Sequence, residues 1–178
     1  MRSSFLRVFT VVLPIVCVAG CGDGSPTGPS APRTDKTTLS FTSDAQHYVG
    51  QGRSVTLTLE TATFMPLVAR SGGYLSVIVQ SKNAPSTQWG FIIVAPTGSG
   101  LTPGSYTTTR FDTLSGVGMD FFGDGRGCNS ATGQLVIHEI RFGPGDTLHR
   151  LRASFNHHCE GASPVLHGEL TVLADPWR

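Results

Sequence analysis

The sequence predicts an all-β fold: a single antiparallel β-sandwich, with a closed β-barrel as the alternative. The chain of 178 residues contains 22 glycines and 11 prolines, and 14% of its residues are charged; this composition is typical of turn-rich β structure. Short apolar or alternating runs recur between clusters of Gly, Pro, Asn, Asp and Ser, which indicates strands separated by turns. No stretch of ten or more residues combines a helical period with helix caps.

The first twenty residues have the composition of an export signal. Arg2 and Arg7 form a positive segment before an apolar stretch, FTVVLPIVCVAG. This stretch is too short to span a bilayer comfortably. The stretch VAGC at its end resembles the lipobox of bacterial lipoproteins, in which the cysteine is acylated and becomes the mature N-terminus. The resemblance implies a signal peptide over 1–20, lipidation at Cys21, membrane lipid as a partner, and an exported, membrane-anchored protein on the periplasmic face or the cell surface. An ordinary signal with a chance cysteine is the alternative.

The remaining chain divides into a tether and a domain. Residues 21–36 are mostly Gly, Ser, Pro and Thr, which predicts a flexible tether, and we assign 37–175 to the β domain. Removal of Arg2 and Arg7 from the 13 basic residues leaves 11 against 12 acidic ones. A nearly neutral chain without a basic run argues against nucleic-acid binding.

Nine strands are predicted along the domain, in TLSF, SVTLTLE, YLSVIVQ, WGFIIVA, LTPGSYTTTRF (after its Pro-Gly turn), GMDFF, GQLVIHEIRF, TLHRLRASF and VLHGELTVL. In the second, Val55, Leu57 and Leu59 alternate with Ser and Thr, as in a half-buried strand. YLSVIVQ and WGFIIVA are apolar enough for central strands, so we expect Trp89 in the core rather than on a sugar-binding platform.

One hairpin is predicted in register. A four-residue loop, 143–146, between GQLVIHEIRF and TLHRLRASF would pair Phe142 with Thr147 and place Glu139 opposite Arg150, a favourable charge pair. In this register one face is apolar and should meet the core; it carries Val136, Ile140, Phe142, Leu151, Ala153 and Phe155.

Two cysteines remain once Cys17 leaves with the signal and Cys21 is lipidated. In an oxidising compartment the simplest state of such a pair is a disulfide. Extension of the hairpin places Cys128 and Cys159 on one face, two positions out of register. We therefore expect a Cys128–Cys159 bridge that ties the open end of the hairpin.

The segments GDGRGCN and FNHHCEG, followed by PVLHGEL, resemble an uncharacterised group of bacterial cell-surface modules. The LTPGSY turn is also similar. The similarity covers roughly residues 38–173. It implies a β-sandwich on a secreted protein with the two cysteines paired, and it implies no activity.

The segment FNHHCEG suggests a metal or catalytic cluster, but strand geometry divides it. Alternate side chains point to opposite faces, so His157 and Cys159 should share the core face while His158 points away. Zinc ligands are usually separated in sequence, and an oxidised cysteine cannot serve as one. We therefore assign no metal or cofactor here and leave open which partner His157 has.

Other candidate residues are weaker. His138 and His149 become diagonal neighbours in the predicted register and could share a proton or a metal. Asp120, Asp124 and Asn129 offer oxygen ligands near glycines, as calcium sites on β-sandwich loops do, but the D-x-D-x-D-G spacing is absent.

No usable motif for nucleophilic catalysis is present in the sequence, and no catalytic residue is assigned. The expectation is a surface lipoprotein whose module has a structural or binding role, with an unknown protein or glycan as ligand. A periplasmic or surface hydrolase and a calcium-dependent ligand-binding module are the alternatives.

Overall fold

The computed structural model describes residues 36–69, 73–109 and 116–173. The predicted signal, Cys21 and nearly all of the predicted tether lie outside them. The described residues form ten strands and no helix: β1 (Thr38–Ser43), β2 (Ser54–Thr58), β3 (Ala62–Ala69), β4 (Tyr74–Ser81), β5 (Gln88–Val94), β6 (Gly104–Thr109), β7 (Val117–Gly123), β8 (Ala131–Gly143), β9 (Thr147–Cys159) and β10 (Leu166–Leu173). Accordingly, no helix among these residues could cross a membrane.

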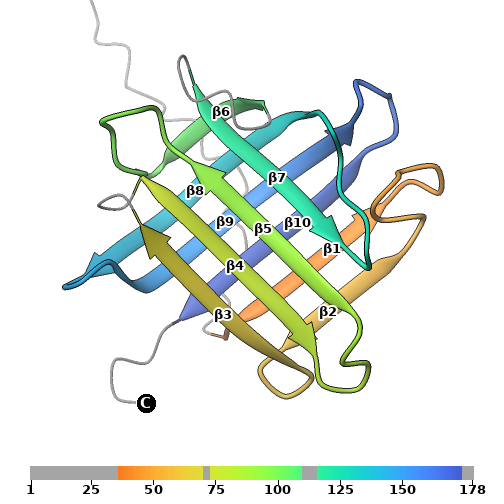
Figure 1. Cartoon of the computed structure of the whole chain (residues 1–178), viewed down its shortest axis with the longest axis horizontal. Helices are drawn as coiled ribbons and strands as arrows, with labels where there is room; N and C mark the ends of the chain where they lie inside the picture. Colours follow the sequence, from red (N-terminus) through yellow and green to blue (C-terminus); the bar gives the residue numbers. More distant parts are fainter. Residues whose placement is uncertain (1–35, 70–72, 110–115, 174–178) are drawn as a thin grey trace, which may run out of the picture. The chain divides into compact units, whose positions relative to one another are not determined.

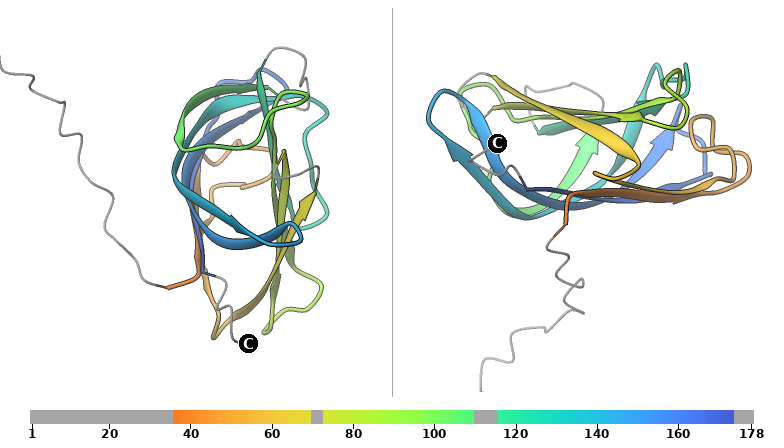
Figure 2. Two further views of the ribbon diagram at one scale, coloured as in Figure 1. Left: turned by 90° about the vertical axis from the view of Figure 1, so that its left-hand side faces the viewer. Right: turned by 90° about the horizontal axis from the view of Figure 1, so that it is seen from below.

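All ten strands belong to one sheet, in the order β2-β1-β10-β9-β8-β6-β7-β5-β4-β3. The sheet bends between β6 and β7, which are parallel and paired over two positions, and the two halves face each other as layers (Figures 1 and 2). The predicted all-β fold is confirmed. The architecture lies between the two predicted ones, because a continuous sheet connects both layers on one side while β2 and β3 remain its two edges.

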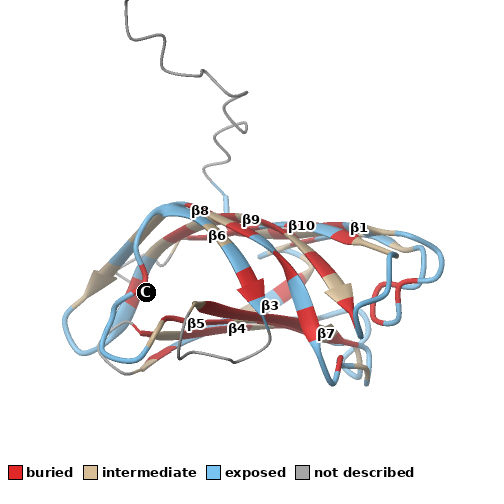
Figure 3. Cartoon of the chain, turned by 90° about the horizontal axis from the view of Figure 1, so that it is seen from above, coloured by how far each residue is buried: buried red, intermediate tan, exposed pale blue. Residues whose placement is uncertain are grey.

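Buried residues lie along the strands of both layers (Figure 3), and their side chains form one hydrophobic core. Phe121 of β7 is fully buried and contacts the rings of Phe41, Trp89 and Phe155, with centroid distances of 5.2, 5.8 and 5.4 Å. Trp89 is 2% exposed, so its predicted place in the core is confirmed. These four aromatic side chains come from both layers and hold them together.

Strand β3 was not among the nine predicted strands. Pro66 lies in its middle. A strand with a neighbour on each side uses its backbone N–H groups as donors, and proline has no N–H to donate. The structure places β3 at an edge, paired only with β4, where proline is tolerated. The strand predicted before it also ends early: β2 stops at Thr58, and Leu59 is 48% exposed in the turn to β3 instead of facing the core.

The predicted hairpin exists, but its register was wrong by one residue over most of its length and by two at 139–141. Gly143 pairs with Thr147 across a three-residue loop, and bulges follow at Arg141/Phe142 and Ile137/Glu139. Over 131–137 the shift of one residue reverses the faces of β8, so Leu135 and Ile137 face the core and Val136 faces outward. The predicted core face of β9 is confirmed, because Leu151, Ala153 and Phe155 are buried; Ile140 and Phe142 also pack against the core. Glu139 lies opposite Arg152 rather than Arg150, yet its carboxylate still forms an ion pair with Arg150 Nε at 2.8 Å.

Candidate functional site

The outer face of the layer β2-β1-β10-β9-β8-β6 carries two rows of polar side chains. Directly paired residues of neighbouring strands share a face, so the registers define each row. The first row is Ser54, Thr42, His167, Asn156, Gln134 and Thr107, and the second is Thr56, Ser40, Glu169, Ser154, Val136 and Ser105. Eleven of these twelve residues are polar, and together they offer hydroxyl, amide, imidazole and carboxylate groups.

A hollow of about 590 Å³ lies over the middle of these rows, and we call it the polar groove. Its walls come from β1, β2, β8, β9 and β10, with His167 and Glu169 exposed near the centre. Some side chains are already positioned: Gln134 Nε2 donates to Thr107 Oγ1 at 3.1 Å, and Asn156 Oδ1 accepts from the Gln134 backbone N–H at 2.7 Å. The groove therefore offers both donors and acceptors, several of them held by neighbours.

A second polar cluster lies inside the domain and contains the partners of His157. His157 is completely buried; its Nδ1 lies 3.4 Å from His47 Nε2 and its Nε2 lies 3.4 Å from Asp120 Oδ1. His47 and Asp120 are 1% and 4% exposed. The predicted split of FNHHCEG agrees with this burial, because His157 and Cys159 are buried and His158 is only half-buried.

The hydrogen bonds of His47 indicate its tautomer. The Gly50 N–H donates to His47 Nδ1 at 3.1 Å, so Nδ1 must be unprotonated. A neutral imidazole then carries its proton on Nε2, which donates to the backbone oxygen of His157 at 3.1 Å. His47 thus ties the β1–β2 loop to β9.

Burial, followed by the nearby His157, lowers the pKa of His47 from 6.5 to about 4. The unfolded chain therefore binds the proton more readily than the folded one. Stability from this group is fully present above pH 6.5 and is lost as the pH falls from there toward 4.

We expect the drop in unfolding free energy between pH 7 and pH 5 to be about 2 kcal/mol smaller in His47→Gln than in the wild type. Denaturant titration at both pH values measures it. Asn83→Ala, at an exposed turn position without a titratable group, serves as the control and should retain the wild-type drop in unfolding free energy between pH 7 and pH 5. An equal drop in unfolding free energy between pH 7 and pH 5 for His47→Gln and the wild type would contradict the lowered pKa of His47.

Cys128 and Cys159 form a disulfide with their Cα atoms 5.3 Å apart, as predicted. Glu160 follows in a left-handed turn conformation (φ 55°), and its carboxylate accepts from the Asn129 N–H at 2.5 Å and from Ser130 Oγ at 3.4 Å. The hydrogen bond from Asn129 is the largest cause of the lowered pKa of Glu160. The GRGCN and HCEG segments are therefore joined covalently and by hydrogen bonds.

A second hollow of about 590 Å³ opens beside β7 on the other layer. Asp120, Ile92 and Phe122 line it together with the glycine-rich turn after β7. The ring of Phe122 lies over Gly90, where a Cβ atom would come within 2.0 Å of it. Asp120 thus faces this hollow while its Oδ1 contacts His157.

The structure does not bring the calcium candidates together. Asp120 contacts the buried His157, whereas Asp124 forms an exposed ion pair with Arg53 at 2.9 Å. Asn129 presents its backbone N–H to Glu160. The three residues therefore occupy separate surroundings.

His138 and His149 also have separate surroundings. The bulge between Ile137 and Glu139 displaces His138, whose Nε2 lies 2.9 Å from Ser154 Oγ. His149 lies against Gly143, near the hairpin loop. The observed register therefore does not produce the diagonal contact between His138 and His149 that the predicted register implied.

Among the described residues, two groups of side chains could hold a metal ion: His47, His157 and Cys159, and Asp120, Cys128 and His157. Within each group the ligand atoms lie within 4.8 Å of one another. Each group contains one half of the disulfide. Since the thiolate is the ligand form of cysteine, a metal could use either complete group only after reduction of Cys128–Cys159.

Sequence reasoning missed His47, which lies 110 residues from His157. No local pattern in DAQHYVGQG marks a buried histidine. Only the pairing of β1 with β10, and of β10 with β9, brings it there.

Comparisons with protein-family models, with curated proteins and with solved structures found no match.

Proposed function

We propose that this protein is an exported, acyl-anchored bacterial lipoprotein whose β domain binds a hydroxyl-rich ligand, a saccharide, in the polar groove. The observation that carries the proposal is the pair of cross-strand polar rows around the hollow on β8, β9, β10, β1 and β2. The lipobox-like VAGC supports the anchor.

The strands beneath the groove favour a ligand bound through side chains. β1, β10, β9 and β8 each pair with a strand on both sides, so their backbone groups are already used and cannot add an extended peptide strand. The side chains that remain present donors and acceptors with little net charge, which suits hydroxyl groups better than phosphates or a charged peptide. Hydrogen bonds, rather than ring stacking, carry the affinity.

His167→Ala and Glu169→Ala are each expected to weaken saccharide binding by about tenfold or more, because each removes an exposed hydrogen-bonding group from the groove. A panel of soluble oligosaccharides, screened first on an array and then by titration calorimetry, provides the probe. Asn83→Ala, in an exposed turn outside the groove, is the matched control. If both groove variants bind like the wild type, the groove is not the site.

The anchor is tested separately. Intact mass of the exported protein should show acyl chains on Cys21 as the mature N-terminus, and Cys21→Ala should abolish them. An unmodified cysteine, or cleavage elsewhere, would contradict the lipoprotein assignment.

The hydrolase alternative would use Asp120, since this carboxylate lines the second hollow and contacts His157. A buried carboxylate and histidine in contact can serve as an acid–base pair. Hydrolysis of ester or glycoside substrates that Asp120→Asn abolishes would favour this alternative over the binding module.

A further inference from the structure

Exposed apolar side chains of the domain are unevenly distributed. Among the described residues, the large hydrophobic side chains that remain exposed are Tyr48, Leu59, Met65 and Leu67. Three of these four lie on β3 or in the turn before it, and they are 48%, 41% and 59% exposed, respectively. Met65 and Leu67 alternate with Val68 and Phe64, which face the core, so both project from the outer face of the edge strand. Leu67 pairs with Ser76 and lies toward the far end of β3, whereas Leu59 and Met65 are nearer to the β2–β3 turn.

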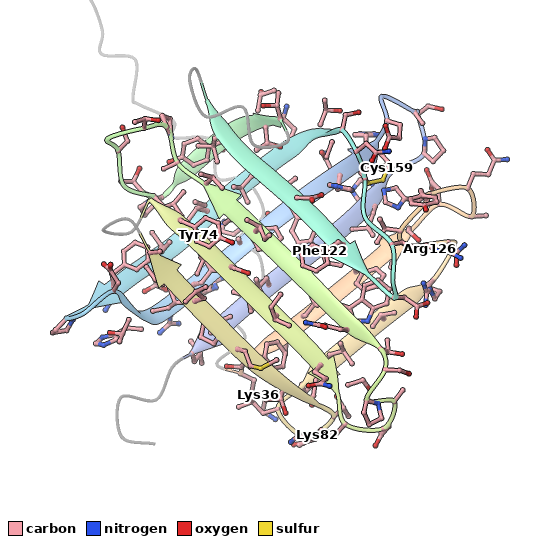
Figure 4. All side chains as sticks on the ribbon, viewed as in Figure 1. Lys36, Tyr74, Lys82, Phe122, Arg126 and Cys159 are labelled. Carbon is pink, nitrogen blue, oxygen red and sulfur yellow. A yellow bond between two sulfur atoms is a disulfide. The ribbon has the colours of Figure 1, made fainter. Side chains whose placement is uncertain are left out.

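Two lysines flank the corner of the domain at the β2–β3 turn. Lys82 donates from its backbone N–H to the Thr61 oxygen at 2.8 Å and from Nζ to the Leu59 oxygen at 2.6 Å. Thr38 pairs with Thr58, so the chain preceding β1 reaches Lys36 beside the β2–β3 turn, and Figure 4 shows Lys36 and Lys82 at one corner of the domain. Glu60 is the one acidic residue of that turn.

The corner also lies where the predicted tether joins the domain. Fourteen residues lie between Cys21 and Lys36, a flexible length that spans roughly 20 Å. If Cys21 is acylated, the tether limits how far Lys36 can lie from the bilayer. Apolar side chains bordered by lysines suit an interface with anionic lipid headgroups.

We propose that this corner, Leu59 and Met65 with Lys36 and Lys82, seats the domain on an anionic membrane surface. The proposal rests on the acyl anchor of the proposed function. Docking here would hold β3 against the headgroups and cover an edge strand that could otherwise pair with another chain. The polar groove lies on the other layer of the sheet and is left accessible.

An environment-sensitive fluorophore tests this in the lipidated full chain on vesicles containing phosphatidylglycerol. One variant carries it at Met65→Cys and the control at Ser99→Cys, an exposed position in the loop after β5; this loop lies at the end of the β3–β5 layer away from Lys82. We expect quenching by spin-labelled lipid at position 65 and none at position 99. Absence of quenching at both positions, while the protein stays on the vesicles, would overturn the docking and leave the anchor intact.

A second measurement removes the dependence on the anchor. The Cys21→Ala full chain should cosediment with phosphatidylglycerol vesicles weakly and in a salt-sensitive manner, and less with phosphatidylcholine vesicles. Leu59→Ser/Met65→Ser should lower this partitioning by about tenfold, whereas Tyr48→Ser, an exposed ring elsewhere, should not. Equal partitioning of the Cys21→Ala chain and of its two further variants would refute the docking surface. A wild-type mass without acyl chains would refute the lipoprotein assignment alone.

Discussion

Replacement of Phe121 by alanine is expected to lower the free energy of unfolding by about 3–5 kcal/mol. Phe121 is fully buried and contacts aromatic rings from β1, β5 and β9, which come from both layers. Removal of its ring leaves a cavity that these strands cannot close without breaking their own hydrogen bonds. Denaturant unfolding followed by tryptophan fluorescence measures the change.

The neighbouring residue provides the control. Phe122 lies on the outer face of β7, over Gly90 and only partly buried (Figure 4). Phe122→Ala should cost less than half as much as Phe121→Ala, because solvent can fill the space. Equal costs would mean that the inner and outer faces of β7 are assigned wrongly.

Loss of the Cys128–Cys159 disulfide is expected to destabilise the domain by about 4 kcal/mol, the chain-entropy value for a sequence separation of 31 residues. The bridge joins the segment before β8 to the end of β9, beside the buried His157. Denaturant unfolding of Cys128→Ala/Cys159→Ala measures the loss.

Reduction offers an independent check of the same bond. Wild-type protein unfolded in a dithiol reductant should match the double variant, while the double variant itself should not respond to the reductant. Detection of two free thiols at positions 128 and 159 in the exported, folded protein would contradict the disulfide.

Local patterns in the sequence were sufficient for the fold class and for most of the strands. Alternation in SVTLTLE and the apolar run WGFIIVA reflect the two-residue period of a strand, a property of the chain itself. Cysteine number and the expected export signal predicted the Cys128–Cys159 pair for a similar reason, since that expectation left only two cysteines to combine. The strand with Pro66 was missed because the sequence does not show which strand lies at an edge.

The exact register and the buried cluster depended on the tertiary structure. Two bulges in the β8–β9 hairpin decide whether Val136 or Leu135 meets the core, and a bulge forms according to packing on both faces rather than from local preference. His47, Asp120 and His157 come from three distant segments, so only the folded sheet brings them into contact. The polar rows likewise arise from the pairing of six strands, each of which alone shows only an ordinary alternation of polar and apolar residues.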